Sequence, residues 1–164
     1  LYDDPSSRRA TIAINQPHHK GANSQDYPCT QYVQFFVRNG KLSMSVCMRS
    51  NDAVYGFCND VFAFALFQQL MLNELNLRGM SLELGHYHHH AGSFHIYEHH
   101  YTMMDEVLAS ATESSVAESR KKHVLKPGIT WNAIEERKLF LPREELTKQG
   151  INDFVEKTSK ELFQ

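Results

Sequence analysis

Hydrophobic and polar residues alternate along two neighbouring stretches of the chain, residues 31–38 and 41–48. A period of two is typical of a β-strand that buries one face. Asn39-Gly40 joins the stretches, and an Asn-Gly pair between two strand patterns is the strongest short signal for a β-hairpin. The sequence therefore predicts an antiparallel hairpin. The apolar face of its second strand comprises Leu42, Met44, Val46 and Met48, and the opposite face Ser43, Ser45 and Cys47.

The next apolar stretch, residues 60–77, predicts a helix. Its hydrophobic residues fall on nearly every side, which indicates burial in a core or an interface. Asp60 stands at the start of this stretch, so one interpretation of its carboxylate is a helix N-cap that accepts backbone N–H groups. The other interpretation, membership of a binding site, stays open at this point.

Weaker patterns complete the predicted fold. Branched residues favour a short strand at residues 10–14, and Pro, Gly and Asn favour a loop at residues 16–25. We expect a strand within residues 80–91, a helix at about residues 98–109 and a peripheral amphipathic helix within residues 143–163. Together these elements predict one α+β domain that spans the whole chain.

Composition limits the partners. The 164 residues carry a net charge of −2, which provides no basic surface for a nucleic-acid polymer, whereas a single phosphate could still bind. The most apolar window, residues 61–72, contains two glutamines and is too short to cross a membrane. Three cysteines without a CxxC pair fit a reducing compartment, so we expect a cytoplasmic protein. Because the chain opens at Leu1 without an initiator methionine, we also expect further sequence upstream.

Polar side chains gather between the hairpin and the helix, in residues 48–60. Polar density at such a junction is common in functional loops. Arg49 and Ser50 could hold a phosphate there.

Cys29 stands just ahead of the first hairpin strand. A free cysteine is most often a small buried hydrophobic residue. To act as a nucleophile, it would need cationic groups nearby that favour the thiolate. Arg8, Arg9 and Arg49 could supply these in space, although a pair of arginines ahead of a strand is more often a solvated edge.

Histidines are frequent in residues 86–90, and neutral imidazole is a common ligand of transition metals. On a strand, His86, His88 and His90 would face one way and His89 the other. No HExxH, carboxylate or cysteine spacing accompanies the run, so we interpret it as compositional and predict no metal site.

His95 and Tyr97 are two residues apart and project to the same side if the chain is extended. An imidazole and a hydroxyl on one side suit a sugar hydroxyl. They could equally satisfy a buried carbonyl group.

Together these residues resemble the thymidylate synthase superfamily, whose landmarks occur in order within about residues 5–105. The matching positions are Arg8-Arg9, Pro28-Cys29, Arg49-Ser50-Asn51-Asp52, Gly56 and His95-Ile96-Tyr97. The resemblance implies an α+β fold in which a mixed sheet packs with helices and one sheet face forms a homodimer. It also implies that the N-terminal part of that fold lies outside this sequence.

The resemblance assigns a role to each landmark. Cys29 would add to carbon 6 of a pyrimidine deoxynucleoside monophosphate. Arg49 and Ser50 would bind the phosphate, with Arg8 and Arg9 reaching across from the partner chain. The sugar 3′-hydroxyl would be bound by His95 and Tyr97. The folate-facing part of the site would include Asp52 and Gly56.

One position departs from the synthases. Eleven residues after Arg49, thymidylate synthases carry Asn, whereas this chain has Asp60, as the subgroup of phage deoxycytidylate hydroxymethylases does. A carboxamide can pair with the N–H and the carbonyl of uracil. A carboxylate instead accepts from the exocyclic amine of cytosine and from a protonated ring nitrogen 3. A slip of one residue would place Asn59 at this position and restore a preference for uracil.

The resemblance thus implies a folate-dependent deoxycytidylate 5-hydroxymethyltransferase, in which both Cys29 and Asp60 are catalytic. Methylenetetrahydrofolate would supply the one-carbon unit, and water would add at the exocyclic methylene. Two alternatives remain beside it. One is a thymidylate synthase that methylates deoxyuridylate, and the other is a nucleotide-binding paralogue without turnover.

Overall fold

The structure is a computed structural model of the 164-residue chain. It describes residues 1–21, 27–111, 125–136, 153, 158–159 and 161–163. The predicted helix within residues 143–163 lies almost entirely outside the described residues. Within the described part, no helix combines the length and the apolar character that crossing a membrane requires.

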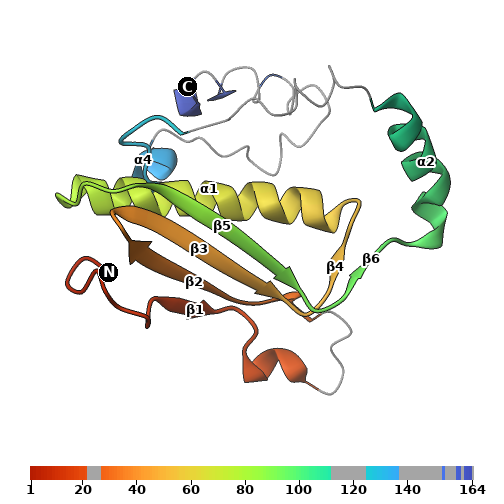
Figure 1. The fold of residues 1–164 in the computed structure, drawn as a ribbon, viewed down its shortest axis with the longest axis horizontal. Helices are drawn as coiled ribbons and strands as arrows, with labels where there is room; N and C mark the ends of the chain where they lie inside the picture. Colours follow the sequence, from red (N-terminus) through yellow and green to blue (C-terminus); the bar gives the residue numbers. More distant parts are fainter. Residues whose placement is uncertain (22–26, 112–124, 137–152, 154–157, 160, 164) are drawn as a thin grey trace.

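The predicted hairpin forms the centre of a four-stranded sheet (Figure 1). Strands β2 (Thr30–Arg38) and β3 (Lys41–Met48) are antiparallel. The turn residues Asn39 and Gly40 have φ values of 51° and 71°, and positive φ at both positions is the geometry that Asn-Gly favours in a tight hairpin. The short strand β1 (Thr11–Ala13) pairs antiparallel with β2, and β5 (Glu83–Ala91) pairs parallel with β3. The predicted mixed sheet is confirmed.

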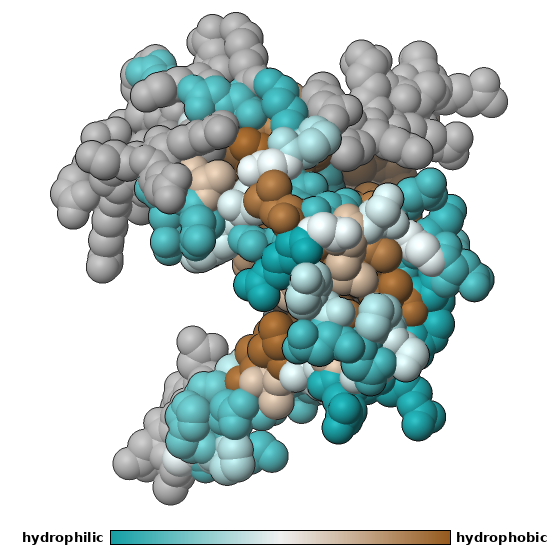
Figure 2. Space-filling model, turned by 90° about the vertical axis from the view of Figure 1, so that its left-hand side faces the viewer, coloured by the Kyte–Doolittle hydropathy of each residue, from teal (hydrophilic) through white to brown (hydrophobic). Residues whose placement is uncertain are grey.

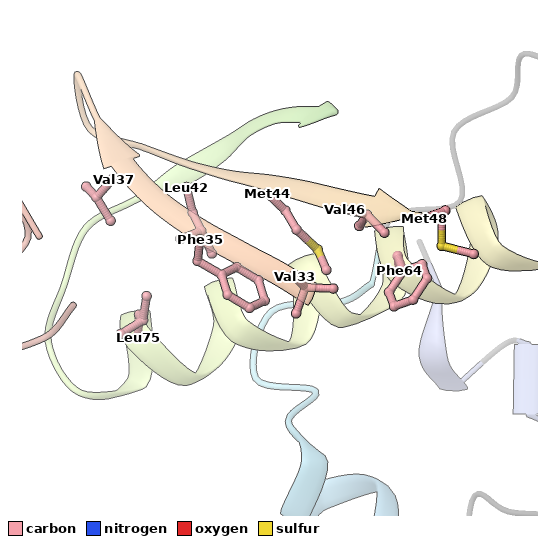
Figure 3. Close-up of a cluster of buried hydrophobic side chains, with 9 residues drawn as sticks. All are labelled: Val33, Phe35, Val37, Leu42, Met44, Val46, Met48, Phe64 and Leu75. Carbon is pink, nitrogen blue, oxygen red and sulfur yellow. The ribbon is translucent and has the colours of Figure 1, made fainter. Parts of the chain in front are cut away.

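Helix α1 (Gly56–Leu77) packs on one face of this sheet. The alternation predicted for the hairpin is confirmed, because the apolar side chains of both strands point toward the helix (Figure 3). The buried cluster comprises Val33, Phe35, Val37, Leu42, Met44, Val46 and Met48 of the sheet, with Phe64 and Leu75 of α1.

A second apolar cluster lies against α1, where Leu70 packs with Leu125, Ile129 and Ile134 of the segment that includes α4 (Trp131–Glu136). Figure 1 shows α4 on the side of α1 that faces away from the sheet. Burial of the helix on nearly every side is nevertheless not observed, since Phe62 is 58% exposed and Leu77 65% exposed. Figure 2 shows hydrophobic residues in patches among hydrophilic ones at one end of the molecule.

Strand β5 contains a β-bulge. Leu42 pairs with Leu84, but Met44 pairs with Tyr87, so β5 uses one more residue than β3 over this interval. A Cβ on Gly85 would stand 2.8 Å from the carbonyl of Leu42, which makes glycine the residue that fits the bulge. Beyond the bulge, Tyr87 and His89 share the α1-facing side of the sheet with Met44 and Val46.

Further short elements follow β3 and β5. The two-residue strands β4 (Asn51–Asp52) and β6 (Phe94–His95) pair in parallel, which brings the polar junction beside the His95-Tyr97 segment. The expected helix at residues 98–109 is a 3₁₀ turn, η2 (Glu98–His100), that continues into α2 (Tyr101–Ser110).

The loop expected at residues 16–25 contains another 3₁₀ turn, η1 (Pro17–Lys20). Pro17 occupies its first position, where the missing N–H has no cost, and this explains why a loop signal became a helical turn.

Candidate functional site

A pocket of about 450 Å³ opens where the ends of β3, β4 and β6 meet the start of α1. Its volume lies in the range of small-ligand sites. Eight of the ten predicted site residues line it: Cys29, Arg49, Ser50, Asp52, Gly56, Asp60, His95 and Tyr97. The other two, Arg8 and Arg9, do not.

Cys29 is exposed at this pocket, immediately before β2. The interpretation of Cys29 as a small buried hydrophobic residue is therefore wrong. Its backbone carbonyl accepts a hydrogen bond of 2.8 Å from the backbone N–H of Arg49, which ties the two chain segments together. The thiol is accessible to a ligand in the pocket.

The guanidinium of Arg49 holds the segment that leads to the cysteine. It donates to the carbonyl of Tyr27 at 3.0 Å and to the carbonyl of Pro28 at 3.3 Å. These bonds fix the orientation of a cationic, planar group at the edge of the pocket, where its remaining N–H groups can meet an anion. Ser50 lines the same pocket.

Asp52 caps the start of α1. Its carboxylate accepts hydrogen bonds from the backbone N–H groups of Tyr55 at 2.8 Å, Gly56 at 3.1 Å and Val54 at 3.2 Å. The bond from Tyr55 is the main cause that lowers the pKa of Asp52 below its ordinary value. Because these donors are satisfied here, α1 begins four residues earlier than expected.

Asp60 therefore lies inside α1, and its interpretation as the N-cap is wrong; Tyr55 is the N-cap residue. One carboxylate oxygen, Oδ2, accepts a hydrogen bond of 2.7 Å from Nδ2 of Asn51. Asn59 is exposed and does not line the pocket, whereas Asp60 does. The geometry thus favours Asp60 over Asn59 as the residue that faces a ligand.

A row of polar side chains continues behind Asp60. Oδ1 of Asn51 lies 2.9 Å from Nε2 of His89, and Nδ1 of His89 lies 2.8 Å from the hydroxyl of Tyr87. Burial lowers the pKa of His89 and raises the pKa of Tyr87 to about 12, with a smaller contribution from the charge of Asp60 to the latter. Asn51 is 3% exposed, so the hydrogen bonds of its side chain replace those that water would make.

Sequence reasoning missed Asn51, Tyr87 and His89. Alternation separates His89 from His86 and His88, but it does not say which set faces α1, because the bulge at Gly85 changes the register. In the part of the chain that the structure describes, no three His, Cys, Asp or Glu side chains come together in a way that could hold a metal ion.

His95 and Tyr97 both line the pocket, with their ring centroids 4.9 Å apart and their planes perpendicular. The carbonyl of His95 accepts a hydrogen bond of 2.8 Å from the backbone N–H of Ala53, which locks β6 beside the polar junction. An imidazole and a phenol hydroxyl on one wall are suited to hydrogen bonding with a hydroxylated ligand.

Arg8 and Arg9 are exposed on the segment before β1. The carbonyl of Arg8 accepts a hydrogen bond of 2.7 Å from the side chain of Gln34, which fastens this segment to strand β2. Arg9 lines a different hollow, together with Leu1 and Tyr2. The two cations are therefore not part of the Cys29 pocket of their own chain.

Known proteins match the part of the chain that contains the sheet, α1 and the Cys29 pocket. The model of the thymidylate synthase family matches residues 1–126. A protein of Methanocaldococcus jannaschii with the description "Putative thymidylate synthase" is 37% identical over 101 residues, which are 59% of this chain and 43% of that protein. The deoxycytidylate 5-hydroxymethyltransferase of Enterobacteria phage T4 is 31% identical over 112 residues, which are 64% of this chain and 45% of the phage protein.

A solved structure agrees with these sequence matches. Thermostable thymidylate synthase A from Bacillus subtilis is similar with a TM-score of 0.60 and 28% identity, over 68% of this chain and 38% of that chain. The matches span less than half the length of each of these relatives. The match of the family model to well over half of this chain, with a shared fold, establishes that the chain belongs to the thymidylate synthase family.

Proposed function

We propose that this protein is a folate-dependent deoxycytidylate 5-hydroxymethyltransferase that acts as a homodimer. The observation that carries the proposal is the carboxylate of Asp60, which faces the Cys29 pocket with one oxygen held by Asn51. A fixed carboxylate can only accept hydrogen bonds, so it suits the amine of cytosine and opposes the carbonyl of uracil. The similarity to the phage T4 hydroxymethyltransferase supports the same substrate.

The proposed reaction begins at Cys29. Its thiolate adds to carbon 6 of deoxycytidylate, which makes carbon 5 nucleophilic toward the one-carbon unit. Asp60 accepts hydrogen bonds from the exocyclic amine and from ring nitrogen 3 once that atom is protonated, and so stabilises the charge that develops on the ring. Arg49 and Ser50 bind the phosphate, and His95 and Tyr97 bind the sugar hydroxyl.

Methylenetetrahydrofolate supplies the carbon, and water completes the hydroxymethyl group. Asp52 and Gly56 line the pocket, as the folate-facing assignment requires. Three backbone N–H groups already bond to the carboxylate of Asp52. Its proposed role on the folate side of the site is therefore to fix the start of α1. We propose that Arg8 and Arg9 complete the phosphate site of the partner chain.

The test is the substitution Asp60→Asn in the longest form of the protein that the gene encodes. We expect kcat/KM for deoxycytidylate to fall by about four powers of ten relative to deoxyuridylate, because a site built on polar pairing rejects a mismatched partner by that order. The matched control, Asn59→Asp, should leave the ratio of the two substrates unchanged, since Asn59 does not line the pocket. An unchanged ratio in Asp60→Asn would contradict the role of Asp60 in base choice.

Thymidylate synthase is the second candidate, favoured by the relatives from Methanocaldococcus jannaschii and Bacillus subtilis. The product distinguishes it, because a synthase reduces the methylene group with a hydride from the folate and releases dihydrofolate. A paralogue without turnover would bind nucleotide but form no covalent adduct between Cys29 and 5-fluorodeoxycytidylate in the presence of the folate, as mass spectrometry would show.

A further inference from the structure

Four side chains form a continuous row from β5 to the pocket. Tyr87 and His89 belong to β5, Asn51 to β4 and Asp60 to α1. The three links measure 2.8 Å, 2.9 Å and 2.7 Å, all within hydrogen-bonding distance. Asn51 and Asp60 line the pocket, whereas Tyr87 and His89 lie behind them and do not.

The chemistry of Asp60 sets the direction of every bond in the row. An ionised carboxylate only accepts, so the group of Asn51 that faces it must be the NH₂ group. The carbonyl oxygen of Asn51 then faces His89 and also only accepts, which requires a proton on Nε2 of His89. In the neutral imidazole, Nδ1 is left as the acceptor for the hydroxyl of Tyr87. All donors therefore point toward Asp60.

Two observations support this arrangement. Burial lowers the pKa of His89, which favours the neutral ring that the row requires. A Cβ at Gly56 would stand 3.0 Å from Nδ2 of Asn51, so the glycine leaves room for the amide where it meets Asp60.

We propose that Tyr87 and His89 are positioning residues that control base choice through Asn51. They hold the amide of Asn51 in the one orientation that donates to Asp60, and the carboxylate then keeps Oδ2 against Asn51 and presents Oδ1 to the base. This inference rests on the proposed function in that Asp60 reads the base. Without His89, the carboxylate of Asp60 alone orients the amide of Asn51, so the amide loses one of its two hydrogen bonds and no longer holds Oδ2 of Asp60 at a fixed place.

The first experiment compares His89→Leu with His89→Gln. Leucine cannot donate to Asn51, whereas the amide of glutamine can replace the Nε2–H group. We measure the affinities for deoxycytidylate and deoxyuridylate by calorimetry, which requires no turnover. The preference for deoxycytidylate should fall about tenfold in His89→Leu, within the hundredfold that a displacement of about 1 Å can cost, and should return in His89→Gln.

Two further variants keep this test decisive. Tyr87→Phe removes only the hydroxyl, so it answers the question if His89→Leu does not fold; its preference should fall about threefold, as for the loss of one hydrogen bond. The control His18→Leu removes an exposed histidine of η1 and should leave the preference unchanged. A preference that stays constant in Tyr87→Phe and in any folded His89→Leu protein would overturn the proposal.

The second experiment uses no nucleotide, so it separates this inference from the proposed function. The ¹⁵N chemical shifts of the His89 ring should show the neutral form with the proton on Nε2, and this tautomer preference should be lost in Asn51→Ala. A ring that carries its proton on Nδ1, or that is charged at neutral pH, would overturn the row of donors. If the wild-type protein binds neither nucleotide, the proposed function fails, whereas the ring shifts still decide whether His89 orients the amide of Asn51.

Discussion

Asp52 and Asp60, which are eight residues apart, have different roles in the polar junction. Asp52 has the N-capping role that the sequence suggested for Asp60, because it binds three backbone N–H groups at the start of α1. Asp60 is thereby free to face the pocket. In the described part of the chain, its carboxylate accepts a side-chain hydrogen bond from Asn51 only. The sequence alone does not show which of these two residues caps the helix and which lies one turn inside it, since both are aspartates.

The cap predicts a pH-dependent contribution to stability. The pKa of Asp52 is lower in the folded protein than its ordinary value of 3.8, so the folded state favours the charged carboxylate. Its contribution is fully present above pH 3.8 and is lost as the pH falls through the lower, folded pKa. Asp52→Ala should therefore lower the urea midpoint at pH 7 and have progressively less effect in acid.

The measurement is urea unfolding, followed by circular dichroism, of wild type and Asp52→Ala at several pH values between 7 and 3. The control is Asp3→Ala, which removes an exposed carboxylate far from α1 in sequence. A difference between wild type and Asp52→Ala that stays constant down to the lowest pH would show that the side chain acts by packing and not by its charge.

At the scale of elements, one buried glutamine adds polar contacts to the apolar packing between α1 and the sheet. Gln68 is 2% exposed, and its side-chain nitrogen lies 2.8 Å from the carbonyl of Leu42 and 3.2 Å from that of His86. These carbonyls flank the bulge, where the regular pairing of β3 with β5 is interrupted. A helix side chain thus donates to backbone carbonyls beside the bulge.

Gln68→Leu should lower the free energy of unfolding by about 1–3 kcal/mol, because leucine keeps much of the volume but removes a buried hydrogen-bond donor from the carbonyls beside the bulge. Chemical denaturation measures this change. Gln16→Leu is the control, since the Gln16 amide donates to the carbonyl of Ala13 at an exposed site where water can replace it. A loss in Gln68→Leu no larger than in the control would show that the bulge carbonyls find other partners.

How much of the structure could be predicted from the sequence also differs from element to element. The hairpin could be predicted because its alternation and its Asn-Gly turn are local signals. The bulge at Gly85 and the pairing of β4 with β6 could not, because both depend on residues distant in sequence. Most of the pocket followed from motif resemblance, whereas the row behind Asp60 required the register of β5.

At the scale of the whole molecule, α1 is the only described helix that packs on a face of the four-stranded sheet (Figure 1). Small and polar side chains, such as Ser43 and Ser45, stand on the opposite face and are only half-buried. In the homodimer that we propose, this face would join the two protomers and bring Arg8 and Arg9 of one to the pocket of the other.

Mixing two inactive variants tests this arrangement. One carries Cys29→Ser, and the other carries Arg8→Ala together with Arg9→Ala. A two-fold dimer formed from one chain of each would contain one complete site, so random exchange should restore about a quarter of the wild-type activity. If the arginines serve their own chain, the mixed dimers contain no complete site and activity stays absent.

Ser45→Arg provides an independent measurement of the same interface. It places a charge in the middle of the sheet face, so two copies would repel across a two-fold axis. Sedimentation should show dimers for the wild type and monomers for the variant. Dimers that persist in Ser45→Arg would place the interface elsewhere.

The extra residue in β5 makes the length of this strand more consequential than the identity of most of its residues. Leu84 and Tyr87 lie opposite Leu42 and Met44, so loss of one residue between them would leave two steps on each strand, and β5 would pair with β3 without a bulge. Tyr87 and His89 would then keep their side of the sheet. A residue added between Tyr87 and His89 would instead put these two side chains on opposite sides of the strand. Functional descendants of this protein should therefore tolerate a single-codon deletion at the bulge but no single-codon insertion between Tyr87 and His89.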